Sequence, residues 1–226
     1  MRSDAAVIFD VDGVLLDLTA PEEDAFFWPF AKLHRLTGLS HDWDSYRIRN
    51  DEDIIDEILE THFGRKPAPA ERQAVVTAYL SHLASDLHMK RLQPEVVPGA
   101  RDLLASLTGN ARLGIATANL LEAAALRLAA CGLWDGLKAH GFGADGGGAK
   151  RQILARAIAS LDLPRDRIVF IGDNLNDVEA GLANEVHFIG FSRDPARTRR
   201  LAEAGAERIC NHHRDTLKHI EDALKL

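Results

Sequence analysis

Near its start the chain reads Val7-Ile8-Phe9-Asp10-Val11-Asp12-Gly13-Val14-Leu15-Leu16-Asp17, a short apolar run that ends in two carboxylates and a glycine. Residues 5–9 carry no polar side chain, which is typical of a strand buried on both faces of a parallel sheet. Asp10 and Asp12 follow at its carboxyl end, the edge where open α/β sheets bind ligands. Because residues two apart in an extended chain project to the same side, both carboxylates can address one substrate.

The same residues allow one other interpretation and exclude another. A turn rich in aspartate can end a strand without any further role. A calcium-binding loop needs glycine at its sixth position and a bidentate glutamate at its twelfth, but Gly13 stands two places too early and Pro21 stands at the glutamate position. The calcium loop is therefore excluded, and the aspartate-rich turn stays open.

The segment Asp10-Val11-Asp12-Gly13-Val14 resembles the first signature of the haloacid dehalogenase-like superfamily, whose members are mostly magnesium-dependent phosphatases. The resemblance implies that Asp10 attacks phosphorus and that Asp12 acts as general acid and base. A carboxylate nucleophile divides phosphoryl transfer into two easier displacements, and a neighbouring acid protonates the leaving oxygen before it activates water. Members that resemble dehalogenases lack the second acid, so Asp12 favours phosphate ester chemistry.

The composition limits the size and the partners of the protein. A chain of 226 residues allows one α/β core and a small additional domain. A net charge of −7 without any run of Lys or Arg argues against nucleic acid, so we expect a small ligand. Cys131 and Cys210 have no metal-type spacing and are interpreted as buried free thiols.

The chain shows no signal-peptide core, and its longest apolar run, over residues 113–134, is interrupted by Asn119, Glu122 and Arg127. We therefore expect a soluble cytoplasmic protein with no membrane partner, as a monomer or a homodimer.

Three helices are predicted after the first strand. The first begins at Pro21, with acids in its first turn, and ends at Gly38; the second ends near Gly64, and the third covers residues 70–92. An all-helical insert at this place resembles the small cap domain of the superfamily. We accordingly expect a core domain formed by residues 1–17 and 94–226 and a helical cap domain formed by residues 18–93.

Residues 46–54 join two of the cap helices and resemble the loop that capped members bring onto the substrate. Arg49 and Asn50 are the candidates for substrate contacts in this loop. The same residue types fit a solvated turn in which Asn50 caps the following helix, and both interpretations stay open.

A short strand over residues 113–116 is predicted to end in Thr117-Ala118-Asn119, which resembles the second signature of the superfamily. The resemblance implies that the hydroxyl of Thr117 holds a phosphate oxygen, with the amide of Ala118 or Asn119 as a neighbouring donor. Taken alone, a threonine after a strand is more often a helix cap.

Residues 141–146 match the spacing of a dinucleotide-binding fingerprint, but no convincing strand precedes them and the glycines continue through Gly148. We interpret them as a flexible loop. Lys150 follows, opens a helix over residues 151–160 and resembles the third signature, in which a lysine neutralises the nucleophile and the phosphate. The usual proline context is missing, so Arg151 stays an alternative to Lys150.

A strand-like run over residues 167–172 ends in Asp173-Asn174-Leu175-Asn176-Asp177 and resembles the fourth signature. The resemblance implies that Asp173 binds Mg²⁺ together with Asp10 and the carbonyl of Asp12, while Asp177 binds through water or orients Lys150. A hard cation with few carboxylates and several waters suits a phosphate site. The simpler alternative is a helix capped by aspartate.

The end of the chain completes the predicted sheet. Strands near residues 186–191 and 208–209, and helices over residues 195–204 and 213–224, give a three-layer Rossmann-like parallel sheet. His212 and His213 are adjacent, so they cannot share a helix face toward one metal and are expected at the surface.

Four signatures in this order predict an α/β core with an inserted cap and a Mg²⁺-dependent phosphatase. It would hydrolyse a small phosphorylated metabolite through an aspartyl-phosphate, in a manner similar to phosphoglycolate phosphatases. Two alternatives stay open: transfer to a second hydroxyl, as in sugar phosphomutases, and a non-catalytic nucleotide-binding regulatory module that uses residues 141–148.

Overall fold

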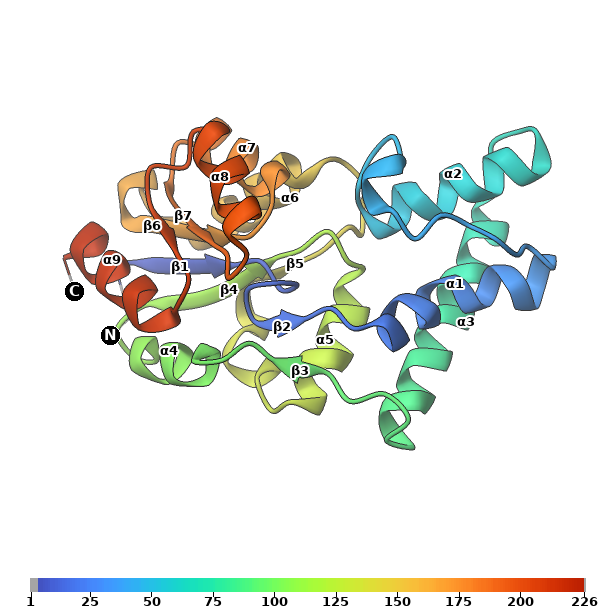
Figure 1. Cartoon of the computed structure of the whole chain (residues 1–226), viewed down its shortest axis with the longest axis horizontal. Coiled ribbons are helices and arrows are strands. Elements are labelled where there is room, and N and C mark those ends of the chain that lie inside the picture. The colour runs from blue at the N-terminus through green and yellow to red at the C-terminus, as the bar shows by residue number, and fades with distance from the viewer. Residues whose placement is uncertain (1–3, 226) are drawn as a thin grey trace.

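The computed structural model describes residues 4–225; residues 1–3 and 226, at the ends of the predicted core domain, lie outside the described part. Within residues 4–225, six parallel strands form one sheet in the order β5-β4-β1-β6-β7-β8, with β1 near the middle (Figure 1). The strands are β1 (Ala6–Phe9), β4 (Arg112–Ala116), β5 (Gly141–Phe142), β6 (Ile168–Gly172), β7 (His187–Phe191) and β8 (Ile209–Cys210). The predicted parallel α/β sheet is confirmed.

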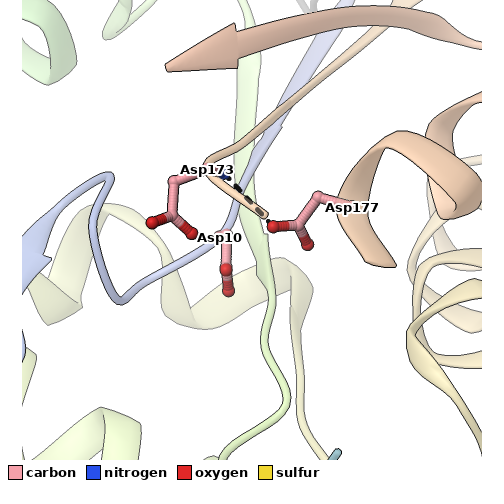
Figure 2. Close-up of side chains that lie close together, drawn as sticks. All are labelled: Asp10, Asp173 and Asp177. Atoms are coloured by element: carbon pink, nitrogen blue, oxygen red, sulfur yellow. Dashed lines mark hydrogen bonds between the residues drawn. The ribbon is translucent and has the colours of Figure 1, made fainter. Parts of the chain in front are cut away.

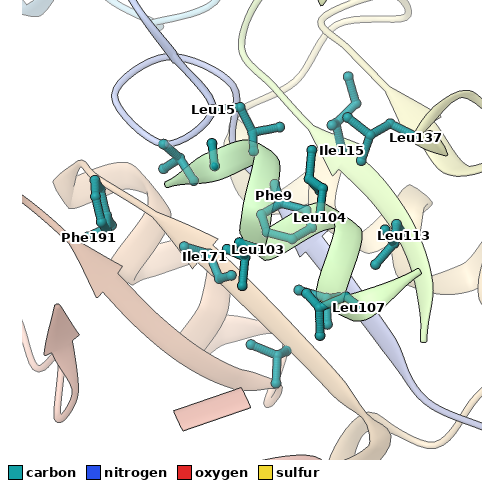
Figure 3. Close-up of a cluster of buried hydrophobic side chains, with 14 of the residues drawn as sticks. Phe9, Leu15, Leu103, Leu104, Leu107, Leu113, Ile115, Leu137, Ile171 and Phe191 are labelled. Carbon is teal, nitrogen blue, oxygen red and sulfur yellow. The ribbon is translucent and has the colours of Figure 1, made fainter. Parts of the chain in front are cut away.

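Helices cover both faces of the sheet. Alternate residues of β1 enter two separate apolar clusters, Val7 and Phe9 on one face and Ala6 and Ile8 on the other. Figure 3 shows the first cluster, in which Phe9 packs beside side chains of α4. The helices of this face are α4 (Ala100–Leu107), α5 (Leu121–Ala130) and α9 (His213–Leu224), and those of the other face are α6 (Lys150–Leu161), α7 (Leu175–Ala183) and α8 (Pro195–Glu203).

The chain leaves the sheet domain and returns to it through a small antiparallel pair, β2 (Leu16–Asp17) and β3 (Glu95–Val96). Between these strands the described chain forms α1 (Ala20–His34), α2 (Asp51–Phe63) and α3 (Pro69–His88), which lie to one side of the sheet (Figure 1). We call residues 18–93 the cap. Its apolar cluster joins Phe26 and Phe30 of α1 to α2 and α3 and includes Leu120 and Ala123 beside α5, so the cap packs on the core.

Several predicted boundaries are wrong by a few residues. The first cap helix ends at His34 and not at Gly38, because Arg35 adopts a left-handed conformation with φ of 56° and its N–H donates to the carbonyl of Ala31. The third cap helix ends at His88 and not at residue 92. Gly141 begins β5, whereas residues 141–148 were expected to form a loop throughout.

Two further predictions concern single residues. Cys210 is buried and Cys131 is half-buried, and both are free thiols. His213 is buried, although a surface position was expected: its Nε2 lies 2.8 Å from the carbonyl oxygen of Val14, and its ring stacks on Phe191. No helix among residues 4–225 combines the length and the apolar character that a membrane span requires.

Candidate active site

Three acidic side chains meet at the carboxyl edge of the sheet. Asp10 follows β1, Asp173 follows β6, and Asp177 lies in the first turn of α7. Figure 2 shows the three carboxyl groups close together, and one oxygen of each lies within 4.8 Å of the others. All three residues are buried. The structure thus brings Asp10 beside two acids that lie more than 160 positions later in the sequence.

Two glycines make room for these acids. Gly13 has a φ of +76°, and a β-carbon at this position would collide with the carboxyl group of Asp173. A β-carbon at Gly172 would collide in the same way with Asp177. The absence of side chains at both positions therefore lets the turn after β1 and the end of β6 approach the acids.

The ammonium group of Lys150 is buried among the acids. Its Nζ lies 2.7 Å from Oδ1 of Asp10 and 2.8 Å from Oδ1 of Asp177. Burial opposes the positive charge, but the two carboxylates raise the pKa of Lys150 above its ordinary value. Arg151, the alternative to Lys150, is exposed and lies 3.8 Å from Glu179. The structure therefore places Lys150, and not Arg151, beside Asp10.

Lys150 leaves the acid cluster incompletely neutralised. Burial raises the pKa of Asp10 well above its usual range; Lys150 opposes this shift, and Asp177 and Asp173 add to it. Burial and the charge of Asp177 raise the pKa of Asp173 to about 6, while Arg197 lowers it. Arg197, in α8, contacts Oδ2 of Asp173. The cluster therefore still favours the approach of positive charge.

The side chain of Asp12 pairs with a buried arginine that sequence reasoning missed as a site residue. The Nη2 group of Arg127, in α5, donates to Oδ1 of Asp12 (2.5 Å), and its Nε donates to Oε1 of Glu22 in α1 (2.6 Å). One sequence signal was available, since a charged residue in the apolar run over residues 113–134 indicates a buried partner.

The predicted phosphate-binding residues lie in the turn after β4. Thr117 is buried; its hydroxyl donates to Oδ1 of Asn119 (3.1 Å) and accepts the N–H of Asn119 (3.2 Å). The carbonyl of Ala118 accepts the N–H of Asp51 (2.9 Å) from the cap. All three residues reach the same cavity as Asp10, but the amide of Asn119 is already engaged within the turn.

Arg49 and Asn50 both line this cavity, in different ways. Arg49 is partly exposed and donates from Nη1 to Oδ1 of Asp44 (2.9 Å). Asn50 is buried; its Oδ1 accepts the N–H of Asp53 (2.9 Å), and its Nδ2 donates to the carbonyl of Gly148 (3.1 Å). Asn50 therefore caps α2 and ties the cap to the glycine-rich loop, which favours the capping interpretation for this residue.

A cavity of about 400 Å³ lies between the cap and the acid cluster. Besides Arg49 and Asn50, cap residues that line it include Glu22, Glu23, Phe26, Trp43, Asp51, Ile54 and Tyr79. The carboxyl group of Asp51 accepts the N–H of Leu120 (2.8 Å), and burial raises its pKa to about 7. Sequence reasoning missed Glu22 and Asp51, because each reads as an ordinary acid in the first turn of a helix.

The glycine-rich loop is held by the protein itself. Arg156, in α6, donates to the carbonyls of Gly143 (3.1 Å), Gly147 (3.1 Å) and Asp145 (3.4 Å). A β-carbon at Gly143 would lie 2.5 Å from the backbone nitrogen of Leu121, so packing explains this glycine. The loop residues do not appear among those that line the described cavity.

The comparison with known families settles the class of the protein. A family model for haloacid dehalogenase-like hydrolases matches residues 5–184. The chain belongs to the haloacid dehalogenase-like hydrolases. A search of curated proteins finds no match to this hydrolase.

Solved structures share the fold of this haloacid dehalogenase-like hydrolase at low identity. A protein provisionally named β-phosphoglucomutase from Bacteroides vulgatus is 19% identical, with 99% of this chain and 91% of that chain covered and a TM-score of 0.72. A predicted phosphoglycolate phosphatase from Haemophilus somnus is 15% identical, with coverage of 97% and 99% and a TM-score of 0.70. CbbY from Rhodobacter sphaeroides, solved in complex with phosphate, is 22% identical, with coverage of 98% and 99% and a TM-score of 0.66.

The acids of this hydrolase fit a divalent cation with oxygen ligands. Mg²⁺ is usually held by one or two carboxylates and several waters. Asp177 is already engaged, because one of its oxygens accepts the N–H of Asp173 (3.2 Å) and the other lies beside Lys150. The side-chain oxygen of Asn176 is buried, lines the cavity and has no hydrogen-bond partner in the described chain. Asp10 and Asp173 are thus the carboxylates best placed to hold an ion.

Proposed function

We propose that this hydrolase is a Mg²⁺-dependent phosphatase that cleaves a small phosphorylated metabolite through an aspartyl-phosphate on Asp10. The observation that carries the proposal is the position of the Asp10 carboxyl group, buried at a strand end between Lys150 and Asp173. A carboxylate so placed meets a phosphate ester beside a fixed positive charge.

In the first step, a carboxylate oxygen of Asp10 forms a bond to phosphorus, and the bond from phosphorus to the ester oxygen breaks. The carboxyl group of Asp12 gives its proton to the departing oxygen, so the alcohol leaves neutral. Lys150 offsets negative charge on Asp10 and on the phosphoryl oxygens, and Thr117 offers its hydroxyl to one of those oxygens.

In the second step, the carboxylate of Asp12 takes a proton from water while the water oxygen bonds to phosphorus. The bond between phosphorus and the Asp10 oxygen then breaks, which restores the carboxylate and releases inorganic phosphate. Asp10, Asp173 and the carbonyl of Asp12 are the groups that would hold Mg²⁺, with Asp177 in support. The ion would offset the negative charge that the phosphoryl group brings to the acids.

The cavity supports a small substrate. A cavity of about 400 Å³ suits a small metabolite. One of the structural neighbours carries the name predicted phosphoglycolate phosphatase, so phosphoglycolate is the first ester to test. Glu23 and Asp51 place carboxyl groups on the cap side of the cavity, whereas both oxygens of Glu22 are bound to Thr19 and Arg127. Polyol and sugar phosphates, whose hydroxyl groups donate to carboxylates, therefore belong in the same screen.

Two alternatives differ from a phosphatase, one in the group that accepts the phosphoryl group and the other in its use of the glycine-rich loop. Transfer of the phosphoryl group to a sugar hydroxyl would use the same Asp10 and Asp12, and a neighbour named β-phosphoglucomutase makes this the second candidate. A sugar bisphosphate formed from the screen substrate would reveal it. A nucleotide-binding regulatory module receives less support, because the glycine-rich loop does not line the described cavity and packing against Leu121 explains Gly143.

The test measures phosphate release from the ester panel with Mg²⁺ and with EDTA, for the parent protein, Asp10→Asn and Asp12→Asn. We expect no turnover in EDTA and none in Asp10→Asn. Asp12→Asn should still show a burst with 4-nitrophenyl phosphate, because this leaving group needs little protonation. Turnover by Asp10→Asn, or equal bursts in the two variants, would contradict the assigned roles.

A further inference from the structure

Arg127 carries a charge into the interior at the meeting point of three segments. Only about 2% of its surface is exposed. Its guanidinium donates to Asp12 after β1 (2.5 Å), to Glu22 in the first turn of α1 (2.6 Å) and to Oδ1 of Asn119 after β4 (3.3 Å). Core and cap therefore share one buried cation at the wall of the cavity.

Packing alone does not explain an arginine at this position. The helix around it is apolar, with Ala123, Ala124 and Leu128 buried, and a buried ion pair is often no more stable than apolar residues of similar volume. Burial opposes the positive charge, yet Asp12 and Glu22 raise the pKa of Arg127 above its ordinary value, so it remains a cation. An effect of Arg127 on the carboxyl group of Asp12 accounts for a positive charge at this buried position.

Glu22 fixes Arg127 from the cap side. Its Oε2 accepts the backbone N–H of Thr19 (2.8 Å) and the hydroxyl of Thr19 (2.8 Å), at the point where the chain passes from β2 into α1. Its Oε1 accepts from Arg127, and its side chain is almost fully buried. Both oxygens of Glu22 are thus engaged, and the guanidinium is held in one orientation by a carboxylate that has its own anchors.

The side chain of Asp12 is more exposed than those of Arg127 and Glu22. A quarter of its side chain is exposed, against 3% for Arg127, and it lines the cavity. The bond from Arg127 goes to Oδ1 of Asp12, which leaves Oδ2 for another partner. A carboxyl group held by one oxygen through a fixed donor keeps its plane and its other oxygen in a defined direction.

We propose that Arg127 is a positioning residue that, anchored by Glu22, holds the carboxyl group of Asp12 so that Oδ2 faces the ester oxygen of the substrate. The inference rests on the proposed function, because it presumes that Asp12 is the acid and base. Oδ2 gives its proton to the departing oxygen in the first step and takes one from water in the second, while Oδ1 keeps its bond to Arg127 throughout. Since Glu22 belongs to the cap, the position of the acid depends on the first turn of α1.

The leaving group distinguishes this role from a structural one. Protonation of the departing oxygen matters for a leaving group of high pKa, such as phenol, and matters little for one of low pKa, such as 4-nitrophenol. In Arg127→Ala we therefore expect kcat/KM to fall by roughly 100- to 1000-fold for phenyl phosphate but by less than about 10-fold for 4-nitrophenyl phosphate. Millimolar guanidinium chloride should restore part of the phenyl phosphate activity, because it refills the space of the lost side chain.

Three further variants complete the experiment. Glu22→Gln should show the same selective loss at a smaller size, and Arg127→Lys should recover part of it; both carry the test if Arg127→Ala does not fold. Arg156→Met, which loses an arginine that donates to loop carbonyls away from the cavity, is the matched control and should affect both esters by the same factor. Each ratio between esters is taken within one variant, so loss of folded protein cancels.

Equal losses for both esters in every Arg127 and Glu22 variant, without rescue by guanidinium, would overturn the inference. Asp12→Asn, measured in the same series, separates this failure from a failure of the proposed function. A selective loss in Asp12→Asn with an even loss at Arg127 would refute the positioning role only. An even loss in Asp12→Asn would refute the acid assignment on which that role rests.

Discussion

Replacing Lys150 by methionine tests the charge balance of the acid cluster without any substrate. The substitution keeps the length of the side chain but removes the cation that lies 2.7 Å from Asp10 and 2.8 Å from Asp177. Removal of one partner of a buried ion pair costs about 3–5 kcal/mol, because the remaining charge is buried and unpaired. For a chain of this size each kcal/mol lowers Tm by about 2–4 °C, so we expect a decrease of roughly 6–20 °C.

The assay is thermal unfolding followed by circular dichroism at pH 7, in EDTA and then in Mg²⁺. Arg151→Met is the matched control, because the neighbouring arginine is exposed and its loss should change the free energy of unfolding by no more than about 0.5 kcal/mol. Mg²⁺ should raise Tm more in Lys150→Met than in the control, because without the ammonium group of Lys150 the carboxyl groups of Asp10 and Asp177 attract the cation more strongly. Equal Tm values for the two variants in EDTA would refute the reasoning.

Three other predictions address the metal, the cap loop and pH. Arg197→Met should tighten Mg²⁺ binding by about two- to fivefold, because the guanidinium group no longer competes with the ion for Asp173. This factor corresponds to an ion pair of about 0.5–1 kcal/mol. Unchanged or weaker binding, measured by calorimetry, would contradict the prediction. Arg49→Ala should lower kcat/KM for the natural ester by roughly ten- to a thousandfold and for 4-nitrophenyl phosphate far less, whereas a parallel decline would make Arg49 a solvated surface charge. Burial lowers the pKa of His213 to about 4, so the folded state favours the neutral ring, and the free energy of unfolding should fall by up to about 3 kcal/mol as pH decreases from 6.5 to 4. Between pH 6.5 and 4 the free energy of unfolding, measured with urea, should depend on pH less steeply in His213→Gln than in the parent. Identical pH profiles would show that the ring is not held neutral.

The sheet and its acids were predictable because their signals are local. An apolar run that ends in Asp10, and another that ends in Asp173, each identify a buried strand and the edge where its ligands lie. The start of α9 at His213 was also found from its sequence. Lys150 and Asp177 were placed near Asp10 by the resemblance to the family signatures and not by a local signal, and their roles stay predictions.

The other features of the fold and the site depend on contacts between residues that are far apart in the sequence. Arg127 reads as an interruption of an apolar helix, and its partners Asp12 and Glu22 lie 115 and 105 residues away. The two residues of β5 are too few for a strand signal and are set by pairing with β4. His213 looks like a surface residue until the chain brings Val14 to its ring.

The pairing of β2 with β3 has a consequence for protein engineering. Leu16 lies opposite Val96 and Asp17 opposite Glu95, so the chain enters and leaves the cap through neighbouring positions. A tight hairpin turn could therefore replace residues 18–94 without altering the register of the six-stranded sheet. Such a minimal protein would present Leu120 and Ala123 to water, and making these two side chains polar should keep it monomeric. A foreign helical module at the same junction would need its own carboxylate beside Arg127, because Glu22 leaves with the cap.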